Sequence, residues 1–292
     1  METINKKSES INIFDDFLAF LEVPRVCQIN KPIFKKMFLD ATDGKKAILD
    51  ATDKKALKDD VLKIRWLYTL KPSTINIAPY KDNEREYPEV AMLHIELASS
   101  EVSKRAVKRI AQFINRAIPY PLVLLFTFEK DEEEILIALA DKRTNQADKE
   151  KWVIDELECS PWIKLGQVFE NINKGEGENE NKNKDSEQNI DRAFINSLNL
   201  SELPFSSFWH FYQALINRVQ ARQCAEISGR YRLVSEHEAE QQREQLQQYR
   251  RIELTIQKLR AQIKQAEFSQ QVVLNTEIKQ QEQQLKNITE HL

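Results

Sequence analysis

The C-terminal stretch, residues 235–292, constrains the fold of this chain most strongly. It contains no glycine and no proline and is rich in Gln, Glu, Lys and Arg, a composition that predicts long uninterrupted helix. Its apolar residues are spaced alternately by four and three from Ile252 through Ile256 and Leu259 to Ile263, which is the spacing of a coiled-coil seam. We therefore expect an extended helical arm.

A second apolar seam in this stretch, through Leu274, Ile278 and Leu285, is out of register with the first. Either a stutter in one continuous helix or a helical hairpin folded near Phe268 produces such a slip, and the sequence leaves both open. Because so thin an apolar stripe is not stable alone, it must be covered by the arm itself or by another chain. The expected interaction residues are Ile252, Ile256, Leu259, Ile263, Phe268, Leu274, Ile278 and Leu285.

Residues 171–190 mark the clearest change of composition along the chain. They hold two of the five glycines, six Asn and almost no apolar side chain, so their ordering entropy is not offset by burial. We interpret them as a flexible polar insertion. The predicted units are an N-terminal helix (1–24), an α/β core (25–170), the insertion (171–190), a helical connector (191–235) and a coiled-coil arm (236–292).

Apolar periodicity predicts a mixed α/β core before the insertion. Helices are expected at 11–21, 31–39, 53–60 (capped by Thr52 or Asp53) and 101–117, and strands at 62–70, 74–78, 89–97, 121–128 and 134–140. The almost wholly apolar segment 121–128 is typical of a strand covered on both faces, with 134–140 as its hairpin partner. The predicted fold class is thus α/β (α+β) with the order α-β-β-β-α-β, followed by the helical arm.

Composition narrows the functional classes. With 43 basic and 46 acidic residues the chain is not a basic nucleic-acid coat, and it has no apolar run of membrane-spanning length and no apolar signal core. We therefore expect a cytoplasmic protein without a membrane partner. Cys27, Cys159 and Cys224 lie too far apart to indicate a disulfide framework or zinc site. No phosphate-binding glycine loop, dinucleotide, nucleophile-elbow or zinc-protease motif occurs, and no metal ligand set is predicted.

Several short segments resemble the bacterial domain-of-unknown-function family 4391. They are Ile29-Asn30-Lys31-Pro32-Ile33, Ile64-Arg65-Trp66, Thr74-Ile75-Asn76-Ile77, His94-Ile95-Glu96-Leu97, Ile118-Pro119-Tyr120-Pro121 and, near the C-terminus, Val273-Leu274-Asn275. The resemblance covers roughly residues 25–292. It implies a companion of helicases and DNA methyltransferases in restriction-type or other antiviral defence systems, and it implies no particular activity.

The order α-β-β-β-α-β is also that of restriction-endonuclease-like cores, in which acids on the second and third strands hold a divalent cation beside a lysine. Here the third strand ends in Glu96-Leu97-Ala98, so the acid is present and the lysine is replaced by Ala98. The second strand offers only Asn76, unless Glu86 or Glu89 substitutes. His94 shares the face of Glu96. Glu96 and His94 are therefore candidate catalytic residues. The favoured interpretation is structural: Glu96 is an acid at a strand end that pairs with Lys104 or Arg105, and His94 is simply hydrogen-bonded.

Basic residues gather in two helical stretches and are candidates for nucleic-acid binding, which would weaken as salt rises. They are Lys104, Arg105, Lys108 and Arg109 in the first, and Arg218, Arg222, Arg230 and Arg232 in the second. A solvated helix face is the alternative interpretation.

The sequence as a whole favours a non-enzymatic accessory subunit of a defence complex without a cofactor. Its arm is expected to dock onto a helicase, nuclease or DNA methyltransferase of the same system, with DNA contacted through the basic faces. The first alternative is a nuclease centred on Glu96 that uses Mg²⁺. The second is a non-specific nucleic-acid-binding homo-oligomer, such as a homodimer formed through the coiled coil.

Overall fold

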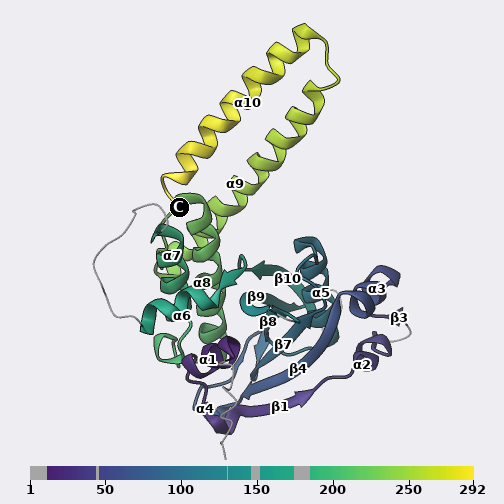
Figure 1. Cartoon of the computed structure of the whole chain (residues 1–292), viewed down its shortest axis with the longest axis vertical. Helices are drawn as coiled ribbons and strands as arrows, with labels where there is room; N and C mark the ends of the chain where they lie inside the picture. Colours follow the sequence, from purple (N-terminus) through teal and green to yellow (C-terminus); the bar gives the residue numbers. More distant parts are fainter. Residues whose placement is uncertain (1–11, 44–45, 130, 146–151, 174–184) are drawn as a thin grey trace, which may run out of the picture.

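The computed structural model describes residues 12–43, 46–129, 131–145, 152–173 and 185–292 (Figure 1). Its helices are α1 Ile13–Phe20, α2 Lys35–Leu39, α3 Ala51–Asp59, α4 Pro72–Ile75, α5 Lys104–Ala117, α6 Leu165–Asn173, α7 Asp185–Ser197, α8 Phe208–Ser228, α9 Glu236–Ile263 and α10 Phe268–Thr289. Its strands are β1 Gln28–Pro32, β2 Thr42–Asp43, β3 Lys46–Ala47, β4 Val61–Leu70, β5 Tyr80–Lys81, β6 Glu86–Tyr87, β7 Val90–Leu97, β8 Leu122–Phe128, β9 Asp131–Thr144, β10 Trp152–Cys159 and β11 Ile163–Lys164.

The described residues form one seven-stranded mixed sheet at the centre of a head domain. The strand order is β1-β4-β7-β8-β9-β10, with β11 added beside β9. Only β7 and β8 run parallel, and α5 makes the crossover between them. The predicted mixed α/β class is therefore confirmed, with a helical C-terminal region.

Helices cover both faces of the sheet, so the central strands are buried on both sides. Along β7, Met92 belongs to an apolar cluster shared with α1, α6, α7 and α8, whereas Leu93 and Ile95 belong to a second cluster shared with α2, α3 and α5. Every residue of β7 and β8 is buried. The predicted double burial of 121–128 and its hairpin with the following strand are both confirmed.

Two predicted elements of the core are wrong. The helix expected at 31–39 is only Lys35–Leu39, because residues 28–32 pair with β4 as an edge strand. The strand expected at 74–78 is replaced by the short helix α4, where the backbone N–H of Lys71 donates to Oγ1 of Thr74 and Asn76 ends the helix in the left-handed conformation. In addition, α3 begins at Asp50 as its cap, rather than at Thr52 or Asp53.

The arm is a helical hairpin, which resolves the register slip found in the sequence. Helices α9 and α10 run antiparallel away from the head, joined by the turn 264–267 (Figure 1). Ile252, Ile256, Leu259 and Ile278 are buried between the two helices. The first seam therefore meets the second within one chain, and the arm covers its own apolar stripe.

The N-terminal helix and parts of the predicted insertion pack into the structure of the head. Helix α1 is not separate from the core, since Phe14 and Phe17 are buried in the apolar cluster on the sheet. Of the predicted insertion, residues 171–173 belong to α6 and 185–190 to α7, while 174–184 lie outside the described residues. Among the described helices, none combines the length and hydrophobicity needed to cross a bilayer.

Candidate functional site

Glu96 forms an ion pair with a lysine from the neighbouring strand. In the antiparallel pairing of β4 and β7, Lys63 lies opposite Glu96, and its Nζ is 3.2 Å from both carboxylate oxygens. The carboxylate is buried, whereas the lysine is largely exposed. The partner of Glu96 is thus Lys63 rather than the expected Lys104 or Arg105, and a lysine stands beside the acid although the position two residues after it is Ala98.

His94 is a buried core residue. Its Nε2 lies 2.7 Å from Oγ1 of Thr127, and its ring stacks on Phe14 with 4.3 Å between centroids. Burial, together with the smaller effect of the positive charges of Arg65 and Lys63, lowers the pKa of His94 to about 4. The ring is therefore neutral at neutral pH and is enclosed by α1, which favours the structural interpretation.

The other expected members of a cation site are not gathered around Glu96. Asn76 closes α4 instead of standing on a strand. Glu86 pairs with Lys81, and Glu89 lies 3.8 Å from Lys71. Among the described residues, no group of three or more His, Cys, Asp or Glu side chains is arranged to hold a metal ion.

Helix α5 presents an exposed basic face, but one of the four residues predicted for it, Arg109, points elsewhere and forms an ion pair. Lys104, Arg105 and Lys108 are exposed. Arg109 instead donates to the fully buried carboxylate of Asp53 at 2.9 Å, and Arg116 donates to the same carboxylate at 2.6 Å. Arg109 therefore helps to fasten α3 to α5.

Two of the basic residues predicted before the arm are interior. The Arg218 guanidinium donates to the backbone carbonyls of Ser197, Ala214 and Glu202. Arg222 pairs with Asp191 at 2.7 Å and is almost fully buried. Both side chains hold α8 against the segment before it, so neither belongs to an exposed basic surface.

The two remaining predicted arginines, Arg230 and Arg232, are exposed, with Arg232 3.7 Å from Glu238.

A polar network joins the arm to the edge of the sheet, and sequence reasoning missed it because β10 was not predicted. Glu158 on β10 accepts hydrogen bonds from Gln220 and Gln223 of α8. Arg250 of α9 donates to Gln223 at 2.8 Å and lies 3.8 Å from Glu158. Glu156, two residues earlier, accepts from Gln247 of α9. The available signal in the sequence was the pair Glu156 and Glu158, which alternate with apolar residues near the end of the segment 152–159.

The tip of the arm exposes large apolar side chains. Phe268 is 82% exposed, Val272 53% and Val273 66%, whereas the seam residues Ile252, Ile256, Leu259 and Ile278 are buried. A groove of about 560 Å³ lies beside them, lined by Gln262, Gln265, Ala266, Ser269, Gln270, Val273 and Leu274. Of the expected interaction residues, Phe268 is thus the one fully presented to solvent, and the seam is structural.

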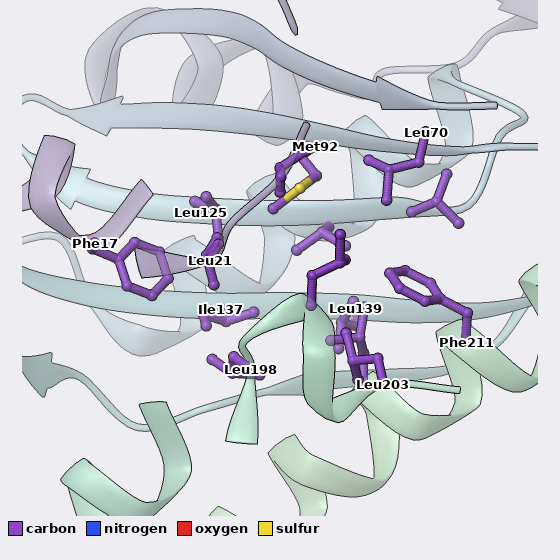
Figure 2. Close-up of a pocket in the computed structure, with 15 residues that line it drawn as sticks. Phe17, Leu21, Leu70, Met92, Leu125, Ile137, Leu139, Leu198, Leu203 and Phe211 are labelled. Carbon is purple, nitrogen blue, oxygen red and sulfur yellow. The ribbon is translucent and has the colours of Figure 1, made fainter. Parts of the chain in front are cut away.

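An internal cavity of about 30 Å³ lies between α1, the sheet and α8 (Figure 2). Figure 2 shows side chains such as Phe17, Met92 and Phe211 converging on it from these three layers. Its lining is entirely apolar, and its volume is about that of one water molecule. Such a space is a packing defect of the core rather than a substrate site.

The described fold and surfaces define a mixed α/β protein that carries a projecting helical hairpin. The chain belongs to the family described as Domain of unknown function (DUF4391), whose family model matches residues 21–285. The resemblance noted in the sequence is thereby confirmed. No curated protein and no solved structure matches the chain.

Proposed function

We propose that this protein is an accessory interaction subunit that binds a partner protein through the tip of its helical arm. The observation that supports this most is the exposure of Phe268, Val272 and Val273 at the end of a hairpin that projects from the head. Clustered exposed apolar side chains are costly to leave in water and are a common mark of protein interaction sites.

The composition of the tip also supports protein docking. From Gln262 to Thr276 the only charged residues are Lys264 and Glu267, whereas the shafts of both helices are highly charged. Depletion of charge and enrichment in aromatic and apolar residues distinguish the centre of protein interfaces from the rest of a surface. Phe268 is an aromatic residue, a type enriched at protein interfaces.

The proposed partner is a helicase, nuclease or DNA methyltransferase, since these are the classes that the family resemblance implies. The exposed Lys104, Arg105 and Lys108 of α5 lie on the head, and in such a complex they would contact DNA while the tip holds the partner. This placement separates protein binding from DNA binding on one chain.

The test is an interaction assay with a tip variant and a matched control. Proteins cross-linked to the full chain in its native cells are identified, and direct binding is then measured with the purified candidate partner. Phe268→Asp is expected to raise the dissociation constant at least about 30-fold, the effect of losing a hot spot of about 2 kcal/mol. Leu254→Asp is the control, because Leu254 is 56% exposed on α9 outside the tip.

Circular dichroism accompanies both variants, since neither replaced side chain is buried. Equal partner affinity for wild type and Phe268→Asp would exclude the tip as the docking surface, and an equal loss with Leu254→Asp would show that the tip has no special role.

One observation favours a second candidate, a divalent-metal-dependent nuclease centred on Glu96. Lys63 supplies beside this acid the lysine that the sequence pattern lacks. However, a divalent cation needs several oxygen ligands, and the described residues near Glu96 offer only a carboxylate already bonded to Lys63. The side chains present therefore do not complete a cation site, and the accessory function is preferred.

The nuclease candidate is tested by incubating the purified protein with Mg²⁺ or Mn²⁺ and linear, supercoiled and single-stranded DNA. Cleavage that disappears in Glu96→Gln and persists in Glu101→Gln, a neighbouring exposed acid, would establish it. Absence of cleavage, or identical cleavage by both variants, removes it.

A further inference from the structure

A polar cleft of about 530 Å³ opens on the head between α1, the short 3-10 helix Arg25–Cys27, the edge strand β1 and its neighbour β4. Its polar lining residues are Asp15, Arg25, Gln28, Asn30, Arg65 and Tyr68. Apolar side chains, including Leu18, Val23 and Leu67, form the remainder of the wall. The volume lies within the range usual for small-molecule sites.

Two guanidinium groups line this cleft without a carboxylate partner among the described residues. Arg65 donates from Nη2 to Oδ1 of Asn30, a neutral acceptor. Arg25 forms no ion pair within the described part of the chain. Asp15 is the one acid among the described lining residues, and it is not within ion-pair distance of either arginine. Two arginines against one aspartate therefore leave the described lining of the cleft with a net positive charge.

The backbone at the cleft wall is distorted in a way that aims Asn30 at Arg65. Asn30 has a φ of 47°, in the left-handed region that non-glycine residues seldom adopt. The pairing of β1 with β4 shifts register between Gln28 and Lys31, and β4 itself is irregular between Trp66 and Tyr68. Bulges of this kind redirect side chains and are over-represented beside functional sites. Left-handed residues other than glycine also cluster at ligand sites.

We propose that this cleft binds a small phosphate-bearing ligand, with the phosphate held between Arg25 and Arg65 and an organic body resting on the apolar wall. Guanidinium groups bind phosphate through paired, charge-assisted hydrogen bonds, and Asn30 fixes the orientation of one of them. A nucleoside monophosphate has the size and the combination of anion and flat apolar ring that the lining accommodates. The same chemistry is present at the 5′-phosphate end of a nucleic-acid strand.

The experiment measures binding of four probes to the full chain by titration calorimetry. The probes are inorganic phosphate, adenosine monophosphate, and a short oligodeoxynucleotide with or without a 5′-phosphate. Saturable binding of adenosine monophosphate identifies a free nucleotide as the source, and binding of the oligonucleotide that requires its 5′-phosphate identifies a strand end. No saturable binding of any probe would overturn the proposal.

Variants assign the binding to the cleft. Arg65→Gln is expected to weaken binding at least about 10-fold, since it removes a charge-assisted donor pair, and Arg25→Gln likewise. Arg65→Lys is expected to bind with intermediate affinity, because a lysine retains the charge without the fork. Lys31→Gln is the control, because Lys31 is an exposed cation of β1 that does not line the cleft. Equal affinity of wild type and the double variant Arg25→Gln/Arg65→Gln would refute the site.

The variant Asn30→Gly tests whether Asn30 orients Arg65 for binding or only contributes to the stability of the fold. Glycine adopts the left-handed conformation without a steric penalty, so the melting temperature is expected to stay equal or rise. The affinity for the phosphate probe is nevertheless expected to fall several-fold, because Arg65 loses its anchor. Unchanged affinity in this variant would contradict the role given to Asn30.

Discussion

Leu259→Ala tests whether the arm is stabilised by its own seam. Leu259 is 8% exposed between α9 and α10, with Ile256 and Ile278 in the same cluster. Truncation removes three carbon groups at about 0.8 kcal/mol each, so about 2.4 kcal/mol of burial is lost before any collapse of the space. Because the seam contains few apolar residues, this loss is a large fraction of the free energy that holds α9 against α10. The fraction of molecules with an open hairpin should therefore rise on the order of 50-fold.

The assay is amide hydrogen exchange measured peptide by peptide, since it reports local opening separately from global unfolding. Protection in α9 and α10 is expected to fall by about the same factor in Leu259→Ala, while protection in β7 and β8 stays unchanged. Leu254→Ala, on the exposed side of α9, should leave both regions as in wild type. Equal loss of protection in the two variants, or loss confined to the sheet, would refute the self-covered seam.

Three further outcomes are expected. The pKa of His94 is lowered to about 4, mainly by burial, so as the pH falls the unfolded chain takes up the proton first. The free energy of unfolding should therefore be highest above about pH 6.5 and fall by up to about 3 kcal/mol between pH 6.5 and pH 4. In urea titrations His94→Gln should flatten this slope. Asp53→Ala leaves two arginines without their buried carboxylate and should lower the free energy of unfolding by about 2–4 kcal/mol in denaturant melts. The double variant Lys104→Glu/Lys108→Glu should abolish any salt-sensitive retention of the protein on DNA. Retention at wild-type strength would show that α5 does not bind DNA.

Strong periodic patterns were sufficient to predict much of the fold. The segment 121–128 is expected to be a doubly buried strand because Thr127 is its one polar side chain, and α5 follows from its 3.6-residue apolar stripe. The arm was recognisable from its two seams, but whether they meet each other or a second chain depends on the turn at 264–267, for which spacing carries no information. The strand expected at 74–78 was wrong because a local hydrogen bond from the Lys71 backbone N–H to the Thr74 hydroxyl, at the start of a helical turn, outweighed β-branched propensity.

The candidate site was less predictable, because its contacts join residues distant in sequence. That Lys63 faces Glu96 follows from the register of β4 against β7, which two irregularities shift. The interior positions of Arg218 and Arg222 depend on α7, which begins at Asp185, inside the segment predicted as a polar insertion. The cleft around Asn30 and Arg65 arises from a backbone conformation that residue type alone does not specify.

The length of α9 has a consequence for how a bound partner would be used. Arg250 of α9 still contacts β10, and from there the helix continues to Ile263 for about 20 Å, so the far end of the hairpin stands well away from the sheet. A molecule held there and a second one held on the head are confined to one small volume, where each meets the other at an effective concentration on the order of millimolar. The arm then acts as a spacer of fixed span, which raises encounter frequency without direct contact between the two attachment points.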